Sequence, residues 1–305
     1  MPQRKMKLKR FLVRTGRSLC AASLLTTFTG CKLLATRPVP PEPEQLPVVA
    51  QGPPATPGKN AIRLSQYVFY CDFDLKQDSP LFQELGELRE QVYKELQLPP
   101  ANNVIQVFLF EDFDKYRAYM KSRYPELPPR RAFFIAQPRS AGGSEELLVY
   151  TYWGPHVQQD LRHELTHALL HSVLKEVPLW LDEGLAEYFE LSPSQRGINR
   201  VHLEELRKTP LQPNLARLER LNIVDDMKQP EYREAWAWVH LMLRSDPQAR
   251  KVLIAYLHQL RQTPGPGPLV PKLTEVFPEL NDALATHLTK IPMPAATTTS
   301  SVVGR

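Results

Sequence analysis

The spacing of apolar residues changes at about residue 157, and this change limits the folds that the chain can adopt. Before it, runs rich in β-branched and aromatic residues alternate with runs whose apolar residues lie three or four positions apart. After it, only the helical spacing continues. This order predicts an α+β chain with its sheet in the first half. We expect strands at 66–75, 103–112, 131–137 and 146–153, and helices at 80–98, 113–124, 157–175, 180–191, 201–208, 231–245, 248–262 and 271–289.

We expect these elements to form one domain over residues 61–290, with two halves that do not fold independently. An α/β half over 61–156 would carry a small mixed sheet of four strands. A mostly helical half over 157–290 would pack against it and leave a cleft between the two.

Residues 1–30 have the composition of an export signal. They hold seven Lys or Arg residues and no acidic residue. The apolar run that follows the basic residues is about a dozen residues long, whereas a membrane-spanning helix needs about 20. The run ends in Phe28-Thr29-Gly30-Cys31, which resembles a bacterial lipobox, although Phe28 replaces the usual Leu. We therefore expect lipidation of Cys31 and a membrane-anchored lipoprotein of the bacterial cell envelope. A secreted or periplasmic protein, or an uncleaved anchor, is the alternative.

The rest of the chain shows no basic surface. The formal net charge is +5, and removing the seven N-terminal positive charges leaves −2, which argues against a nucleic-acid partner. Residues 31–60 contain eight prolines and predict a disordered tether, and residues 291–305 predict a frayed tail. With Cys31 lipidated, Cys71 is the one cysteine of the mature body, so we expect no internal disulfide.

The segment LRHELTHALLH, residues 161–171, predicts a metal-binding helix. His163 and His167 are four residues apart and project from one face, within reach of a single ion. Glu164 lies about 100° round the helix from His163, where it can take a proton from water without binding the ion. His171 is about 12 Å along the axis from His163, too far for the same ion, and no Gly turns the chain before it. We expect His171 to be a packing or surface residue.

The third ligand must come from another element, because catalytic zinc usually has three protein ligands. A second helix is predicted from PLWLDEGLAEYFE, residues 178–190, in which Glu183 and Glu187 are one turn apart. Packed against the first helix, it could place Glu183 at the ion. Glu187 could then accept a hydrogen bond from the far nitrogen of a ligand histidine.

These two segments resemble the gluzincin branch of zinc metallopeptidases, which includes thermolysin and the M1 aminopeptidases. They are more closely similar to the peptidase-MA-like proteins of unknown function found as bacterial envelope lipoproteins. The shared pattern is His–Glu–x–x–His, a short gap, and a Glu before Gly-hydrophobic-Ala, here Glu183 before Gly184-Leu185-Ala186. The resemblance covers residues 61 to about 260 and implies a zincin-like fold with Zn²⁺ in the cleft.

The resemblance implies that His163, His167 and Glu183 bind the zinc ion and that Glu164 is the general base. Two departures are visible. Glu187 stands where thermolysin-like enzymes carry an Asp, and the fifteen residues between His167 and Glu183 are slightly fewer than in the aminopeptidases. The aminopeptidase motif Gly-x-Met-Glu-Asn is absent from the sequence, so N-terminal specificity is not supported.

Gluzincins also use a Tyr or His to stabilise the oxyanion. Tyr232 lies 49 residues after Glu183, a distance broadly similar to that in the aminopeptidases. Alternatively, Tyr232 is one of the side chains on the buried face of a helix and has no role in catalysis. The strand predicted from ELLVYTYW is either a sheet edge that binds peptide or an ordinary core strand.

We expect a zinc-dependent metallohydrolase, in the first place a peptidase acting on a peptide or protein substrate. One alternative is an envelope lipoprotein that binds peptides or proteins on a zincin scaffold without cutting them. Another alternative is a protein that binds no metal, in which the histidines are surface residues. The sequence carries no indication of the oligomeric state.

Overall fold

The computed structural model describes residues 56–58, 60–138, 145–209 and 212–293. The expected signal segment, Cys31, most of the expected tether and most of the expected tail lie outside these residues. Within the described part of the chain, no helix combines the length and the apolar character that crossing a membrane requires.

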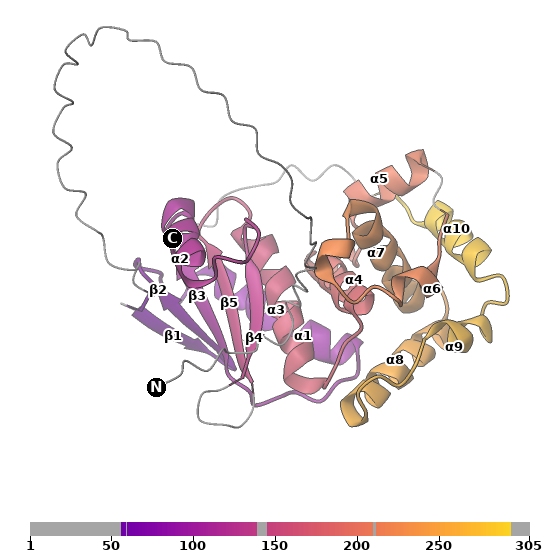
Figure 1. Cartoon of the computed structure of the whole chain (residues 1–305), viewed down its shortest axis with the longest axis horizontal. Helices are drawn as coiled ribbons and strands as arrows, with labels where there is room; N and C mark the ends of the chain where they lie inside the picture. Colours follow the sequence, from indigo (N-terminus) through magenta and orange to yellow (C-terminus); the bar gives the residue numbers. More distant parts are fainter. Residues whose placement is uncertain (1–55, 59, 139–144, 210–211, 294–305) are drawn as a thin grey trace, which may run out of the picture.

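A mixed sheet of five strands occupies the N-terminal half, and helices fill the C-terminal half (Figure 1). The strand order is β1-β2-β3-β5-β4; β2, β3 and β5 are parallel, and the edge strands β1 and β4 are antiparallel to their neighbours. The expected α+β class is therefore confirmed. The strands are β1 (Asn60–Leu64), β2 (Tyr67–Cys71), β3 (Ile105–Phe110), β4 (Phe133–Gln137) and β5 (Glu146–Tyr152).

The expectation of four strands was wrong, because the sequence pattern did not predict β1. It forms a hairpin with β2 in which Leu64 pairs with Tyr67, leaving a loop of two residues. That loop is Ser65-Gln66, with Ser65 at a φ of 53°. Hairpin turns of this length are usually signalled by Gly, Asn or Asp, and neither loop residue gives that signal.

Strand β5 is an interior strand, so the suggestion that it forms the sheet edge was also wrong. It pairs with β3 on one side and β4 on the other. Leu147 and Val149 face the core shared with the helices, whereas Leu148 and Tyr150 face a smaller core on the other side of the sheet. A strand covered on both faces is apolar at consecutive positions, as the buried residues of β5 are, and this pattern is typical of an interior strand.

Three helices flank the sheet. In the contacts between elements, α1 and α3 lie together, α3 packs on β4 and β5, and α2 packs on β3 and β5. Tyr116, Tyr119 and Met120 of α2 belong to the smaller core. The helices are α1 (Pro80–Glu95), α2 (Phe113–Arg123) and α3 (Val157–Val173).

The helices after α3 form the second half. The single helix expected at 271–289 is in fact two, because Pro278 lacks a backbone N–H and restricts the preceding residue. The elements are α4 (Leu179–Phe189), η1 (Pro193–Gln195), α5 (Arg200–Lys208), α6 (Leu215–Leu218), η2 (Val224–Asp226), α7 (Gln229–Arg244), α8 (Pro247–Gln262), α9 (Val270–Thr274) and α10 (Leu280–Lys290).

Helix α4 connects the two halves, because it packs on α3 on one side and on α7 on the other. The approach to α7 is close at Gly184. A methyl group in place of its hydrogen would lie 2.6 Å from the backbone oxygen of Ala235 and 2.9 Å from a methyl carbon of Val239. Only glycine leaves room for this contact.

Replacing Gly184 with alanine tests that contact. We expect Gly184→Ala to lower the free energy of unfolding by about 1–3 kcal/mol, because the backbone of α7 must move away from the new methyl group. Gly86→Ala in α1 is the matched control, since nothing lies within 4 Å of its added methyl group. It should be neutral or stabilising by up to about 1 kcal/mol. Urea denaturation of both variants measures the difference, and equal midpoints would contradict the close packing.

Candidate metal centre

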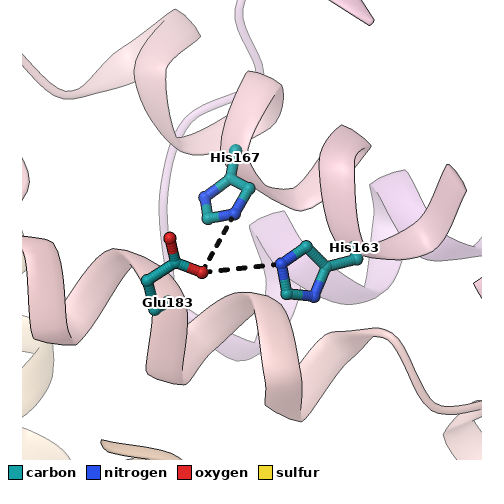
Figure 2. Close-up of side chains that lie close together, drawn as sticks. All are labelled: His163, His167 and Glu183. Atoms are coloured by element: carbon teal, nitrogen blue, oxygen red, sulfur yellow. Dashed lines mark ion pairs between the residues drawn. The ribbon is translucent and has the colours of Figure 1, made fainter. Parts of the chain in front are cut away.

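Helix α3 presents a polar side to α4. Its apolar residues Leu161, Leu165 and Ala168 are fully buried, and the helix packs on β4 and β5. His163 and His167 lie on the side that faces α4 (Figure 2). The helical period separates the two sets of residues, so burying the apolar side directs both histidines toward the second helix.

Helix α4 contributes a carboxylate that lies within 4 Å of both rings. Pro178 precedes its first turn in an extended conformation, and Glu183 follows in the second turn with its side chain buried. The Oε2 atom of Glu183 is 3.6 Å from Nε2 of His163 and 3.6 Å from Nε2 of His167 (Figure 2). The structure thus brings together the three residues expected to bind a metal ion.

The spacing of these atoms suits a zinc ion. All three donor atoms lie within 4.8 Å of one another. Tetrahedral zinc with bonds of about 2.0–2.2 Å has its ligand atoms about 3.3–3.6 Å apart, and the two distances to Glu183 fall at that limit. Two imidazoles and one carboxylate also match the donor types that zinc prefers. Only a small adjustment of the side chains is needed to hold the ion.

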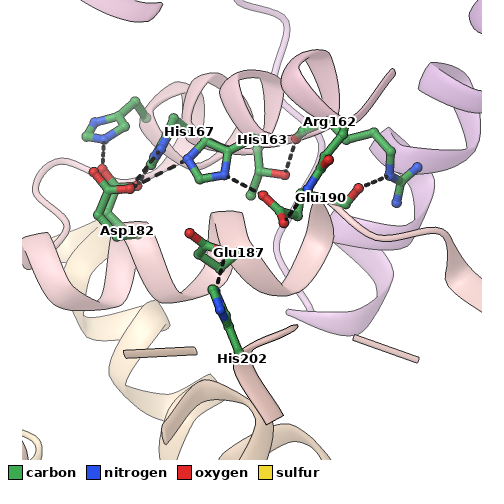
Figure 3. A network of polar contacts seen from close by, with 11 residues as sticks. Arg162, His163, His167, Asp182, Glu187, Glu190 and His202 are labelled. Atoms are coloured by element: carbon green, nitrogen blue, oxygen red, sulfur yellow. Dashed lines mark hydrogen bonds and ion pairs between the residues drawn. The ribbon is translucent and has the colours of Figure 1, made fainter. Parts of the chain in front are cut away.

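Glu190 fixes the far side of the first imidazole. Its Oε2 atom lies 3.0 Å from Nδ1 of His163, while its Oε1 atom accepts hydrogen bonds from Gln159 at 2.8 Å and Asn199 at 3.4 Å (Figure 3). A carboxylate that accepts the Nδ1 proton leaves Nε2 with a lone pair for a metal. Glu190 therefore orients His163 and selects the tautomer that can bind a metal.

Arg162 holds the end of α4 that carries Glu190. The guanidinium is almost fully buried and donates to the backbone oxygen of Glu190 at 3.2 Å and to that of Leu191 at 2.6 Å. It also lies 3.7 Å from a carboxylate oxygen of Glu84. A buried cation at the C-terminus of a helix is favourable, because the last carbonyl groups point toward it.

Asp182 plays a similar part for the second imidazole. Its Oδ1 atom lies 3.1 Å from Nδ1 of His167, and its Oδ2 atom lies 2.8 Å from Nε2 of His171 (Figure 3). The carboxylate thus connects the two histidines. His171 lies outside the candidate donor group of His163, His167 and Glu183, but it contacts Asp182, which also contacts His167.

The role expected for Glu187 was wrong. Its carboxylate pairs with Nε2 of His202 at 2.8 Å, and the contacts to the Nδ1 atoms of the ligand histidines come from Asp182 and Glu190 instead (Figure 3). A helical signal for Glu190 was present in the sequence. Glu190 lies two turns after Glu183 and shares its side of the helix.

Buried charges shift the pKa values of the donors. Burial lowers the pKa of His167, but Asp182 and Glu183 outweigh that effect and raise it to about 10. The pKa of His163 is likewise raised well above its usual value, because hydrogen bonds to Glu183 and Glu190 outweigh burial. Burial raises the pKa of Glu183, but the two imidazoles lower it to about 2. The site therefore favours a bound cation, and a metal ion would have to displace the protons of the two rings.

The expected general base lies beside the donors. Glu164 lines the same cavity as His163 and His167. Burial raises its pKa, although the two histidines oppose the shift. A carboxylate with a raised pKa suits a group that takes up a proton and releases it again.

Tyr232 of α7 also lies near the cluster and is half-buried. Burial and the negative charge of Glu183 raise its pKa to about 12, and Arg130 and His163 oppose the shift. The phenol therefore carries its proton at neutral pH and can donate a hydrogen bond. Its nearness to Glu183 follows from the close packing of α4 on α7.

A cavity of about 620 Å³ opens beside the cluster. Edge strand β4 forms one wall through Phe133, Phe134 and Ala136, and residues 219–225 contribute to another. The ring of Phe134 stacks on that of His171 at a centroid distance of 5.2 Å. The cavity also reaches the segment before α4, so it extends beyond the metal donors along α3.

Comparison with known proteins finds that this region is similar to a family without an assigned activity. A model of "Protein of unknown function (DUF1570)" matches residues 159–265, about a third of the chain, and this stretch contains all three metal donors. No curated protein matches the chain.

One solved structure with partial similarity is the crystal structure of an M1 zinc metallopeptidase from Deinococcus radiodurans. The identity is 16% and the TM-score is 0.41. The match covers 77% of this chain and 52% of the other, so the chain spans about half the length of that protein.

The contacts of Glu190 predict its effect on metal affinity. We expect Glu190→Gln to weaken Zn²⁺ binding about 10- to 100-fold, because His163 loses the charged partner of its Nδ1 atom. Glu187→Gln is the matched control, one turn away on the same helix. It should change the affinity less than about threefold, because the Glu187 carboxylate pairs with His202 and not with a candidate ligand histidine. Competition with a chromophoric chelator measures both.

Comparing the Zn²⁺ affinities of Glu190→Gln and Glu187→Gln also distinguishes two possible positions of the metal ion. His163, Glu187 and Glu190 form a second group whose donor atoms lie within 4.8 Å of one another. A loss of affinity in Glu187→Gln as large as that in Glu190→Gln would favour this second position and contradict the assignment to Glu183.

Proposed function

We propose that the protein is a zinc-dependent metallohydrolase, in the first place a peptidase with a zincin-like site. The observation that carries the proposal is the arrangement of Glu164 beside three converging donors, all on one cavity. Two histidines and a glutamate are a standard set for catalytic zinc, because they leave one position open. Zinc, when bound, would polarise a carbonyl group and lower the pKa of a water molecule.

The protein side chains supply the proton transfers. Glu164 takes a proton from the attacking water and passes it to the leaving amine, which its raised pKa favours. Tyr232 donates a hydrogen bond from its hydroxyl group to the oxyanion of the tetrahedral intermediate. Asp182 and Glu190 keep His167 and His163 in place during these steps.

A peptide substrate suits the edge strand beside the site. Edge strand β4 has β5 on one side, and its residues 133, 134 and 136 line the cavity. An extended peptide can add to such an edge through backbone hydrogen bonds. The strand adjoining the cavity is β4, which replaces β5 as the candidate for this contact.

A non-catalytic binding module is the competing function. The same edge and cavity would then hold a partner peptide without cutting it. Metal content and cleavage together separate the two proposals, because only the hydrolase requires Glu164.

Glu164→Gln tests the proposed chemistry. We expect kcat/KM for peptide cleavage to fall about 10²- to 10⁴-fold while the metal content stays stoichiometric, since only the general base is lost. His163→Ala should lose both metal and activity. A fluorogenic peptide library and elemental analysis of each purified variant are the measurements. Wild-type protein with metal but no cleavage would favour the binding module, and wild-type protein without metal would contradict both.

We also propose that the protein is a lipoprotein of the bacterial envelope, anchored through Cys31. In a bacterial expression host, a clickable palmitate analogue should label the wild type and place it in the membrane fraction. Cys31→Ser should lose the label, whereas Cys20→Ser, a cysteine inside the signal segment, should keep it. An unlabelled wild-type protein in the periplasmic or secreted fraction would contradict the anchor.

A further inference from the structure

Each candidate ligand histidine has a carboxylate of α4 on the far side of its ring (Figure 3). One carboxylate oxygen of Glu190 lies 3.0 Å from Nδ1 of His163. One carboxylate oxygen of Asp182 lies 3.1 Å from Nδ1 of His167. Each carboxylate therefore has a second oxygen that does not contact the ligand ring, and the partner of that oxygen decides how the carboxylate is oriented.

The second oxygens are both held by other side chains. The Oε1 atom of Glu190 accepts hydrogen bonds from the amide groups of Gln159 at 2.8 Å and Asn199 at 3.4 Å. The Oδ2 atom of Asp182 lies 2.8 Å from Nε2 of His171. His171 thus has the same place relative to Asp182 as the two amides have relative to Glu190.

The ring of His171 is itself well held. It lies on α3 one turn after His167, and its side chain is 5% exposed. Phe134 of β4 stacks on it at a centroid distance of 5.2 Å. An ionised carboxylate only accepts hydrogen bonds, so the proton in the contact with Asp182 belongs to Nε2 of His171. His171 is therefore a buried donor with a fixed direction.

The contact between Asp182 and His167 depends on how the carboxylate is oriented. The two facing atoms, Oδ1 and Nδ1, are buried, and neither makes a hydrogen bond to any other group in the described part of the chain. A metal ion on Nε2 of His167 requires the ring proton on Nδ1, and that proton then needs an acceptor. The side-chain torsion that turns an aspartate carboxylate has a broad profile, so its partners set the orientation. Holding Oδ2 keeps Oδ1 in reach of the ring.

We propose that His171 is a positioning residue for the metal centre. By holding Oδ2 of Asp182, it keeps Oδ1 beside Nδ1 of His167 and directs Nε2 of that ring toward the metal position. His171 thus acts on the metal ion through two other side chains, although it is too far along α3 to bind the ion. This inference rests on the proposed function, and specifically on zinc bound by His163, His167 and Glu183.

Two substitutions of His171 separate its hydrogen bond from its ring. His171→Phe keeps an aromatic ring beside Phe134 and removes the donor. We expect it to weaken Zn²⁺ binding about tenfold, because the orienting hydrogen bond to a charged group is lost. His171→Gln keeps an N–H donor and should bind Zn²⁺ within about threefold of the wild type. Competition with a chromophoric chelator measures these affinities, and equal affinities of His171→Phe and the wild type would overturn the proposal.

His202→Phe is the matched control. Nε2 of His202 lies 2.8 Å from the carboxylate of Glu187, which is also on α4, so this variant removes the same kind of contact at the same distance. Because Glu187 is not the carboxylate that faces Nδ1 of either candidate ligand histidine, the Zn²⁺ affinity should change less than about threefold. A loss as large as that in His171→Phe would overturn the proposal, since any disturbance of α4 would then be sufficient.

Double variants show whether His171 acts through Asp182. In the Asp182→Ala background, His171→Phe should weaken Zn²⁺ binding by less than about twofold more, because the residue on which it acts is absent. In the Glu190→Gln background it should keep its effect of about tenfold, since Glu190 orients the other ligand. Equal further losses in the two backgrounds would overturn the proposal and assign His171 to packing alone.

A measurement on the wild type is independent of how the variants fold. In zinc-loaded protein with ¹⁵N-labelled histidine, long-range ¹H–¹⁵N spectra should show the proton of His171 on Nε2 and that of His167 on Nδ1. An unprotonated Nε2 in His171 would overturn the proposal. The visible spectrum of the Co²⁺-loaded protein reports ligand geometry, and it should change in His171→Phe but not in His171→Gln or His202→Phe.

These measurements separate the positioning role from the proposed hydrolysis, because none of them requires cleavage. If the wild type cleaves no peptide but the affinities and spectra are as expected, hydrolysis fails and the role of His171 stands. If the wild type cleaves peptides and His171→Phe keeps the wild-type affinity and Co²⁺ spectrum, the role of His171 fails alone. A wild type that binds no zinc would overturn both.

Discussion

The contact between Glu183 and the imidazoles of His163 and His167 is the interaction on which the rest of the site depends. A carboxylate buried at the centre of the molecule is costly unless it is paired. Glu183 is paired with two rings, and each ring is paired in turn with another carboxylate, Glu190 or Asp182. Glu183, Glu190 and Asp182 thus surround the two rings and favour positive charge at this position, either as protons or as a metal ion.

The packing of α4 against α7 helps to hold Glu183 in position. Gly184 follows Glu183 and lets α7 approach so closely that a methyl group would collide with the backbone of Ala235. The same approach places Tyr232 of α7 near the carboxylate of Glu183. Gly184 thus allows α7, which carries the candidate oxyanion donor Tyr232, to lie close to the helix that carries Glu183.

Much of the site could be predicted from the sequence, because its parts are local. The spacing of His163, Glu164 and His167 determines their relative directions on any helix, whatever surrounds it. Glu183 could be predicted from the sequence pattern of the helix that follows. Glu187 and Glu190 were both compatible with the same helical side, and the choice between them depended on where His202 lies, which local spacing does not specify. Strand β1 was missed for a related reason, since its turn lacks the usual residues and its pairing is a property of the sheet.

The sequence alone determined which residues are candidates for the chemistry, since the candidate metal donors and the candidate general base follow from helical periodicity and residue type. It also determined the α+β order of elements, because strand and helix periods differ. Only the tertiary structure decided which carboxylate meets which imidazole and which strand forms the edge of the sheet. It alone placed Tyr232 near Glu183. These relations join residues far apart in the chain, and they depend on the distances at which helices and strands pack, which no local pattern records.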